Sequence, residues 1–213
     1  MNTLRLLTIA ALTVLLGAPA AYAGLLDDLV KSIENSDNEQ ARVLLQKGLD
    51  VNSTDQQGNT LLMLAARTGN DELVDHLIKL RARVSSRNRY GDSALMLAAM
   101  GGHEKVVRRL LQAKAPIIHS GWTPLIYAAF QGHGGIVDML VERGADLDAQ
   151  APNGMTALIA AARNGHKPAV RSLLEAGAGL NLRDSNGRTA VGWAKATGNT
   201  DIAEQLTGLG ATD

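Results

Sequence analysis

The residues best suited to catalysis or metal binding are five histidines, because the chain contains no cysteine. Three of them, His103, His133 and His166, each directly follow a glycine and recur at almost constant intervals along the chain. Metal ligands must lie about 2 Å from one ion, whereas helical units repeated in this way stack about 10 Å apart. These three histidines therefore cannot share an ion, and we interpret them as structural residues at helix starts.

Two short motifs resemble parts of catalytic sites. His103-Glu104 lacks the second histidine of a zinc protease motif. The segment 132–135, Gly-His-Gly-Gly, resembles a phosphate or oxyanion loop, but it lies in phase with turns that recur along the chain. No serine has the setting of a nucleophile elbow. We therefore expect no catalytic residue, no metal and no cofactor, and we predict that the protein is not an enzyme.

Composition excludes further classes of protein. The chain has 213 residues, 46% of them hydrophobic, with 21 basic and 21 acidic residues. That hydrophobic content is typical of a folded protein, and a neutral chain lacks the basic surface that nucleic-acid binding needs. The absence of cysteine excludes a disulfide scaffold and a thiolate metal site.

The first 23 residues have the layout of a secretory signal peptide. Arg5 precedes an apolar run over residues 6–16, and residues 21–23, Ala-Tyr-Ala, match the small-x-small cleavage pattern. The apolar run is shorter than the ~20 residues of a membrane span. We predict cleavage before Gly24, export without an integral membrane segment, and a periplasmic location if the host is Gram-negative.

Glycines recur in three series that keep one phase. The first series is Gly58, Gly91, Gly121, Gly154 and Gly187, which are evenly spaced except for one shorter step from Gly91 to Gly121. The second series follows the first at a constant offset, at Gly69, Gly102, Gly132, Gly165 and Gly198. The third follows the second at another constant offset, at Gly144, Gly177 and Gly210, with Arg81 and Lys114 in the same position of two earlier units.

Each unit predicts two helices. Segments 60–66, 93–99, 123–129 and 156–162 are similar in sequence, and each ends in an Ala pair. Each begins with Thr or Ser, residues that can cap the start of a helix. Pro124 suits a first helical position, and the second glycine suits a helix end. A second helix follows, with apolar residues at i, i+1, i+4 and i+5, as in Val106, Val107, Leu110 and Leu111.

This pattern resembles the ankyrin repeat. The resemblance covers residues 24–213 and implies an all-α solenoid of helix-turn-helix units, joined by β-turn or hairpin fingers and capped at both ends. After the signal peptide, 1–23, we expect an N-cap unit at 24–54, repeats at 55–87, 88–120, 121–150 and 151–183, and a C-cap repeat at 184–213. Such a capped array is expected to be a monomer on its own.

In ankyrin stacks the concave binding surface is built from finger tips and the outer ends of the first helices. By repeat phase and charge, the expected partner-binding residues are Arg67, Arg87, Arg89, Tyr90, Asp92, Met100, Trp122, Phe130, Gln131, Met155, Arg163 and Asn164. Exposed aromatic and Arg side chains dominate many interfaces. The connection 114–121 is shorter than its counterparts, so Trp122 should lie in a notch. Tyr127 and Trp193 fall within first helices, where we expect them in the core.

Charge is uneven along the chain. Residues 81–114 carry eight basic and two acidic side chains, net +6, and the rest of the mature chain carries net −7. Such polarity can steer a protein partner with an acidic patch. Alternatively, the basic segment is a solvated surface without a role.

The residues favour an exported module that binds one folded protein through its concave face and regulates, inhibits or protects it. The family resemblance implies two alternative functions. One is immunity against a periplasmic toxin or cell-wall enzyme, and the other is support of a partner enzyme such as a haem catalase in oxidative stress. A structural role in the envelope and a secreted, host-directed effector are further alternatives. The sequence does not choose among them.

Overall fold

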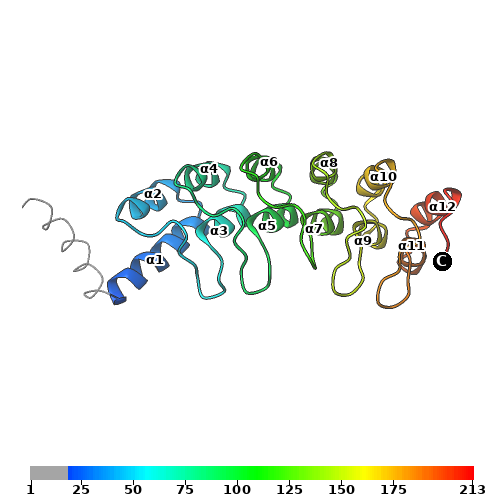
Figure 1. Cartoon of the computed structure of the whole chain (residues 1–213), viewed down its shortest axis with the longest axis horizontal. Helices are drawn as coiled ribbons and strands as arrows, with labels where there is room; N and C mark the ends of the chain where they lie inside the picture. The colour runs from blue at the N-terminus through cyan, green and yellow to red at the C-terminus, as the bar shows by residue number, and fades with distance from the viewer. Residues whose placement is uncertain (1–18) are drawn as a thin grey trace, which may run out of the picture.

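The computed structural model describes residues 19–213, which form an elongated stack of helix pairs (Figure 1). Apart from one isolated antiparallel bridge between Thr54 and Thr60, residues 19–213 contain no β-strand. The helices are α1 (Pro19–Glu34), α2 (Asn38–Gln46), α3 (Leu61–Arg67), α4 (Asp71–Lys79), α5 (Ala94–Gly101), α6 (Glu104–Gln112), α7 (Pro124–Gln131), α8 (Gly134–Glu142), α9 (Ala157–Asn164), α10 (Lys167–Glu175), α11 (Ala190–Ala196) and α12 (Thr200–Gly208). None of them is long and apolar enough to cross a membrane.

The predicted all-α solenoid is confirmed. The first helices α3, α5, α7, α9 and α11 form one row and the second helices form another (Figure 1). Loops project beyond the first row; we call them fingers 1 to 5, at residues 55–59, 88–92, 118–122, 151–155 and 184–188. At the N-terminal end, α1 begins at Pro19, so the predicted cleavage point before Gly24 falls inside this helix. The rest of the predicted signal peptide lies outside the described residues.

Each first helix begins at a hydroxyl residue, as predicted. Thr123, for example, accepts a hydrogen bond of 3.2 Å from the backbone N–H of Ile126. The same cap is made by Thr60, Ser93, Thr156 and Thr189. Because these caps are buried, the hydroxyl is the partner that the helix's free N–H group would otherwise lack.

The recurring histidines tie one repeat to the next. The ring of His103 lies 3.0 Å from the carbonyl oxygen of Arg67, at the end of the previous first helix. His133 and His166 make the equivalent contacts with Met100 and Phe130, at 3.2 and 3.0 Å. Each histidine also opens its own second helix, as predicted. The histidines are therefore spaced connectors between repeats.

The histidine bridges explain a second requirement for glycine at helix ends. Gly102 has a left-handed backbone, φ +75°, and a Cβ placed on it would lie 2.6 Å from the His133 ring of the next repeat. Gly69 faces the ring of His103 in the same way. Only glycine combines the left-handed turn with this close approach.

Fingers differ in how they are fastened. In finger 2 the N–H of Asn88 donates to the carbonyl of Asp92 at 3.0 Å, which closes the loop. The N–H of Arg89 donates to Gln57 of finger 1 at 3.1 Å, and fingers 4 and 5 are joined by an equivalent bond of 2.9 Å from Ser185 to Asn153. Within residues 19–213, finger 3 makes no such backbone bond to either neighbour, and it projects less far than the others (Figure 1).

We predict that Gly102→Ala destabilises the protein more than Gly144→Ala. Gly144 also has a left-handed backbone, φ +77°, but a Cβ there would meet nothing within 4 Å. The control should therefore cost only the ~1–2 kcal/mol of a left-handed alanine, while Gly102→Ala adds the clash with His133. Urea unfolding measures both costs. Adding His133→Ala to Gly102→Ala should recover part of the loss; equal costs for the two glycines would contradict the close-approach argument.

Candidate protein-binding face

Fingers and first helices share one surface, which we call the inner face. Its centre is an aromatic cluster of Trp122, Tyr127 and Phe130. Trp122, from finger 3, stacks on Tyr127 of α7 with ring centroids 5.3 Å apart and planes 25° apart. Phe130, one helical turn further along α7, meets Trp122 edge-on at 6.4 Å. All three side chains are half-buried, so their rings form a fixed but accessible apolar surface.

Tyr127 belongs to this surface, and its expected place in the core is wrong. Its hydroxyl donates a 2.9 Å hydrogen bond to the carboxylate of Asp92, on finger 2. Burial raises the pKa of the Tyr127 phenol, and the bond to Asp92 raises it further, so the hydroxyl stays a donor. Repeat phase could not have shown this, because Leu64 and Leu97 occupy the same position in earlier repeats and are buried.

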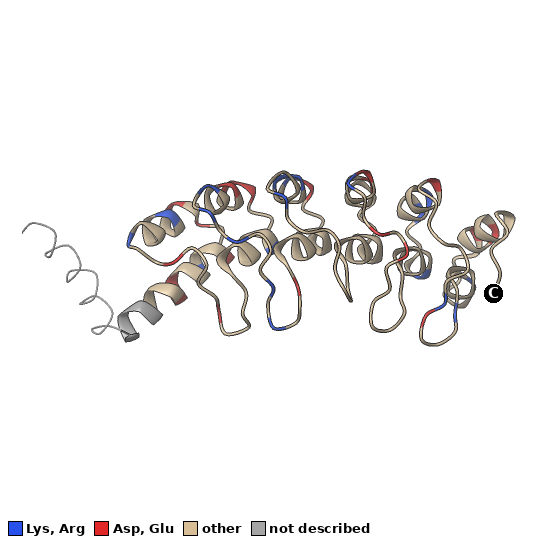
Figure 2. Cartoon of the chain, viewed as in Figure 1, with Lys and Arg blue, Asp and Glu red and all other residues tan. Residues whose placement is uncertain are grey.

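Finger 2 presents the most exposed aromatic residue of the set. Tyr90 is 77% exposed and is flanked by exposed Arg89 and Arg87. Lys and Arg colour this finger in Figure 2, whereas fingers 3 and 4 carry no charged residue. Among the basic side chains of segment 81–114, Arg109 pairs with Asp75 at 2.8 Å, and the others form no ion pair with a described residue. The unpaired charge is thus available to an acidic partner.

Met155 does not lie on the inner face, contrary to expectation. Its side chain is only 2% exposed and is part of the core. The same repeat has Ala160 where its neighbour has Tyr127. A methyl group at that position leaves volume that a flexible thioether can fill. We therefore remove Met155 from the candidate binding residues.

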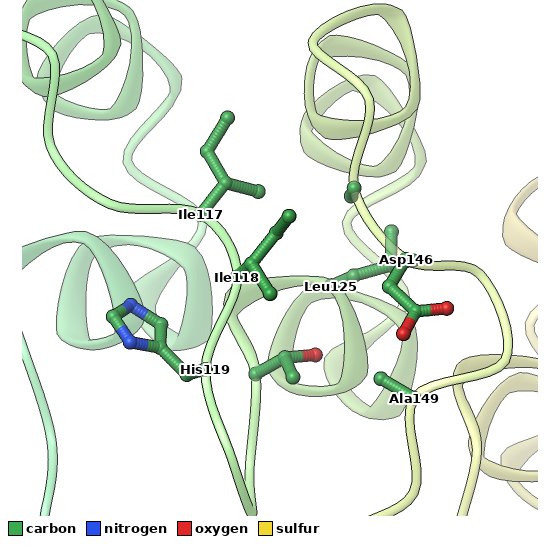
Figure 3. A pocket seen from close by; sticks show the side chains of 8 residues that line it. Ile117, Ile118, His119, Leu125, Asp146 and Ala149 are labelled. Carbon is green, nitrogen blue, oxygen red and sulfur yellow. The ribbon is translucent and has the colours of Figure 1, made fainter.

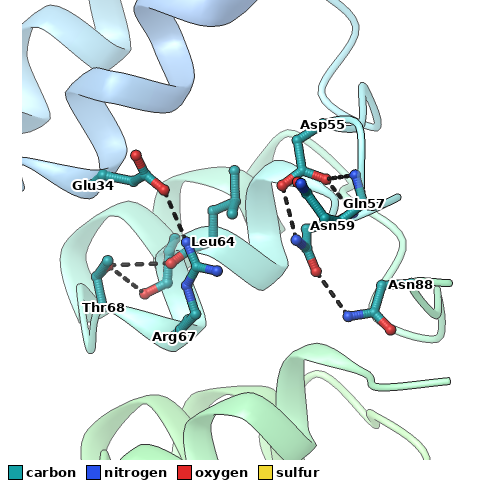
Figure 4. Close-up of polar contacts among 9 residues, drawn as sticks. Glu34, Asp55, Gln57, Asn59, Leu64, Arg67, Thr68 and Asn88 are labelled. Carbon is teal, nitrogen blue, oxygen red and sulfur yellow. Dashed lines mark hydrogen bonds and ion pairs between the residues drawn. The ribbon is translucent and has the colours of Figure 1, made fainter. Parts of the chain in front are cut away.

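The other predicted residues lie at the ends of the first helices. Arg67 is exposed and pairs with Glu34 of the N-terminal unit at 2.9 Å (Figure 4). Met100 is half-buried against the core, and Gln131 is exposed. Asn164 is exposed and donates a 2.7 Å bond to the carbonyl of Phe130, so it braces the aromatic cluster from the next repeat. These residues lie at equivalent ends of successive first helices, in the same row as the cluster.

Polar side chains hold finger 1 against finger 2. The Asp55 carboxylate accepts from the N–H groups of Gln57 and Asn59 at 2.9 and 2.8 Å (Figure 4). The amide of Asn88 then reaches across to Asn59 at 2.8 Å. Asn59 is consequently buried and supports the fingers instead of facing a partner.

At the C-terminal end, Arg163 lies over the ring of Trp193, with its guanidinium carbon 4.2 Å from the centroid. Arg188 of finger 5 lies over the same ring at 4.7 Å. Trp193 packs against the core, as expected, but it remains half-exposed. The last repeat therefore contributes a second ring to the inner face.

The shortened connection carries two apolar residues, Ile117 and Ile118, at the start of finger 3. Ile118 is 70% exposed, and with Ile117, Leu125 and Ala149 it lines a small hollow between α7 and the loop that follows α8 (Figure 3). The hollow has room for about one water molecule, so it is no small-molecule site.

His119 fixes the shortened connection to Arg87, the residue just before finger 2. One ring nitrogen, Nε2, lies 2.9 Å from the carbonyl of Pro116, and the other contacts the Arg87 guanidinium. Burial lowers the pKa of His119, the Arg87 charge lowers it further, and the Pro116 carbonyl opposes both effects. The neutral ring can donate to Pro116 and accept from Arg87 at once, whereas a protonated ring would place two cations together.

Residues 19–213 contain no grouping of three or more His, Asp or Glu side chains that could hold a metal ion. The inner face offers apolar rings, unpaired guanidinium groups and amides instead. Such a surface can recognise another macromolecule by packing and charge.

Comparisons with known proteins agree with this geometry. A family model described as ankyrin repeats (3 copies) matches residues 29–118, 62–151 and 146–212. An ankyrin repeat protein of Rickettsia bellii (strain RML369-C) is 28% identical over 138 residues, which are 60% of this chain and 39% of that protein, so the chain spans about two fifths of its relative's length. A chain in the solved complex of a predatory endopeptidase from Bdellovibrio bacteriovorus with an immunity protein has TM-score 0.76 and 30% identity, covering 84% of this chain and 96% of that one.

The His119 contact predicts a pH dependence of stability. Because the folded-state pKa lies below the ordinary value of 6.5, the unfolded chain binds more protons as the pH falls. The free energy of unfolding should therefore decrease from about pH 7 to 5. His119→Gln removes the titrating group and should flatten that slope in urea unfolding. An unchanged slope in this variant would assign the dependence to other groups.

Proposed function

Because the chain belongs to the ankyrin-repeat family, we propose that it works by binding another protein through the inner face. The observation that carries this proposal is the aromatic cluster. Trp122, Tyr127 and Phe130 hold one another in place and still face solvent in part. Preordered aromatic residues bind with little loss of conformational entropy, which makes them effective interface anchors.

We further propose that the partner is an exported hydrolase, such as a peptidase, whose activity the bound protein blocks. The similarity to a chain of the endopeptidase–immunity protein complex supports this class of partner. The size of the surface supports it too, because a row of five fingers and five first helices can cover a folded domain. Masking an active site needs contact area and complementary charge but no catalytic residue in the binding protein.

The main test uses Trp122→Ala. Residues 24–213, immobilised, should capture a partner from the periplasmic extract of the native host, and mass spectrometry identifies it. With that partner purified, Trp122→Ala should weaken affinity roughly 30-fold or more, as expected for a hot spot worth ~2–4 kcal/mol.

Leu209→Ala is the matched control for this test. It removes another large, exposed apolar side chain (56% exposed) from the end of α12, outside the inner face. It should leave affinity unchanged. If Trp122→Ala and the original protein are both folded by circular dichroism and bind the partner with equal affinity, Trp122 is not part of the interface. A hydrolase partner should lose activity on binding; a partner whose activity stays constant would contradict the inhibitory role.

We also propose that the protein is exported and cleaved before Gly24. The sequence features of residues 1–23 support this location. The mature protein isolated from the periplasmic fraction should begin at Gly24 by N-terminal sequencing. Ala23→Lys places a large charged residue at the cleavage position and should leave the precursor uncleaved. A full-length product in the cytoplasm of the native host would contradict export and, with it, an exported partner.

A further inference from the structure

The second ring of the inner face is held in an unusual charged setting. Two guanidinium groups lie over the Trp193 ring: that of Arg163 from α9 and that of Arg188 from finger 5, at 4.2 and 4.7 Å from the ring centroid. Its Nε1 donates a 2.7 Å hydrogen bond to the carboxylate of Asp184. The indole is thus fixed by a hydrogen bond while it positions both cations.

The carboxylate of Asp184 is already occupied. One oxygen accepts from the N–H groups of Asn186 and Arg188, at 2.9 and 3.0 Å, and the other accepts from Trp193. Although burial by itself raises the pKa of Asp184, these donors lower it below its usual range, so the group is ionised. Asp184 is only 7% exposed and supports the ring from within.

The two guanidinium groups themselves have no carboxylate partner among the described residues. Ion pairs elsewhere in the chain engage Arg42, Arg67, Arg109, Lys167 and Lys195. Arg163 is half-buried and Arg188 is exposed, and each guanidinium carries five N–H donors in a planar fork. Two such groups held on one indole are preorganised for a carboxylate, because their side-chain entropy is already reduced.

Repeat phase places this cluster relative to the aromatic one. Trp193 occupies the position of Tyr127 two repeats later, and Arg188 occupies the position of Trp122. In both repeats, therefore, a finger residue covers a ring on the first helix. The repeat between them has Ala160 and Met155 at these two positions, and both are buried. The inner face thus carries two ring-containing sites, at Tyr127 and Trp193, separated by one repeat without an exposed ring.

Resting on the proposed function, we infer that Arg163, Trp193 and Arg188 form a receptor for a carboxylate of the partner. The partner then presents an apolar group to Trp122 and an Asp or Glu side chain about 20 Å away, since repeats stack about 10 Å apart. An extended segment spans that distance in about six residues. Fingers 3 and 4, which carry no charge, leave the path between the two sites neutral (Figure 2).

The test needs no natural partner. The chain has two tryptophans, so Trp122→Phe leaves Trp193 as the single fluorescent indole. Titration with a hexaglutamate peptide at low salt should change the Trp193 emission saturably, and hexaglutamine should not. Adding Arg163→Gln and Arg188→Gln should weaken the apparent affinity about tenfold or more, because charge-assisted bonds are lost.

The control pair is Arg143→Gln with Arg171→Gln. It removes the same total charge from two exposed arginines, one at the end of α8 and one on α10, and should leave the Trp193 response unchanged. The single variant Arg188→Lys, which keeps the charge but not the planar fork, should weaken binding as well. Circular dichroism confirms that each variant is folded.

An emission that does not respond to hexaglutamate, or a response equally reduced by the control pair, overturns the receptor. Either result leaves the test of Trp122 untouched, so the two proposals fail separately. With a purified partner, the Arg163→Gln, Arg188→Gln variant should bind more weakly than the original protein. Adding Trp122→Ala to it should reduce the affinity by the same factor as in the original protein. Additive losses, as expected for sites two repeats apart, support the two-site arrangement.

Discussion

The structure depends on how closely one first helix can approach the next. Small side chains make that approach possible: Ala98, Ala99, Ala128 and Ala129 of the first helices α5 and α7 are fully buried. At the ends of these helices the glycine backbone admits the histidine ring of the following repeat, which then bonds to the preceding carbonyl. This spacing sets the phase of everything else, including the distance between residues of the inner face. A protein with few large side chains can therefore still display its few aromatic rings at regular intervals.

Repetition explains why most of the fold could be predicted from the sequence. Each cap, apolar stripe and helix-ending glycine recurs in several units, so one ambiguous position is corrected by its counterparts. Arg81 and Lys114 show how far phase overrides local preference. Both stand where later units have glycine, and both adopt left-handed backbones, φ 64° and 60°. Packing between neighbouring repeats holds these two residues in a left-handed conformation that is unfavourable for residues with a Cβ atom.

The binding face was less predictable, because side-chain exposure depends on pairs of residues from different segments. Met155 was expected at the surface but is buried, in a repeat with Ala160 where its neighbour has Tyr127. Tyr127 was expected in the core but lies under Trp122, with its hydroxyl held by Asp92 of another finger. The pairing of Arg163 with Trp193 joins two repeats as well. Repeat phase locates such positions, but it does not say which neighbour will cover them.

The unfastened finger 3 has a mechanical consequence. Backbone bonds join fingers 1 and 2, and others join fingers 4 and 5, whereas within residues 19–213 finger 3 has no backbone bond to a neighbouring finger. Side chains make the contacts instead: His119 of finger 3 with Arg87, just before finger 2, and Tyr127 of α7 with Asp92 of finger 2. The row of fingers is thereby divided into two stiffer blocks with a compliant joint at residues 118–122. Bending at this joint would alter the curvature of the solenoid while each helix pair stays intact. The aromatic cluster sits on the joint itself, so a ligand held there would act as a splint that sets the angle between the two blocks.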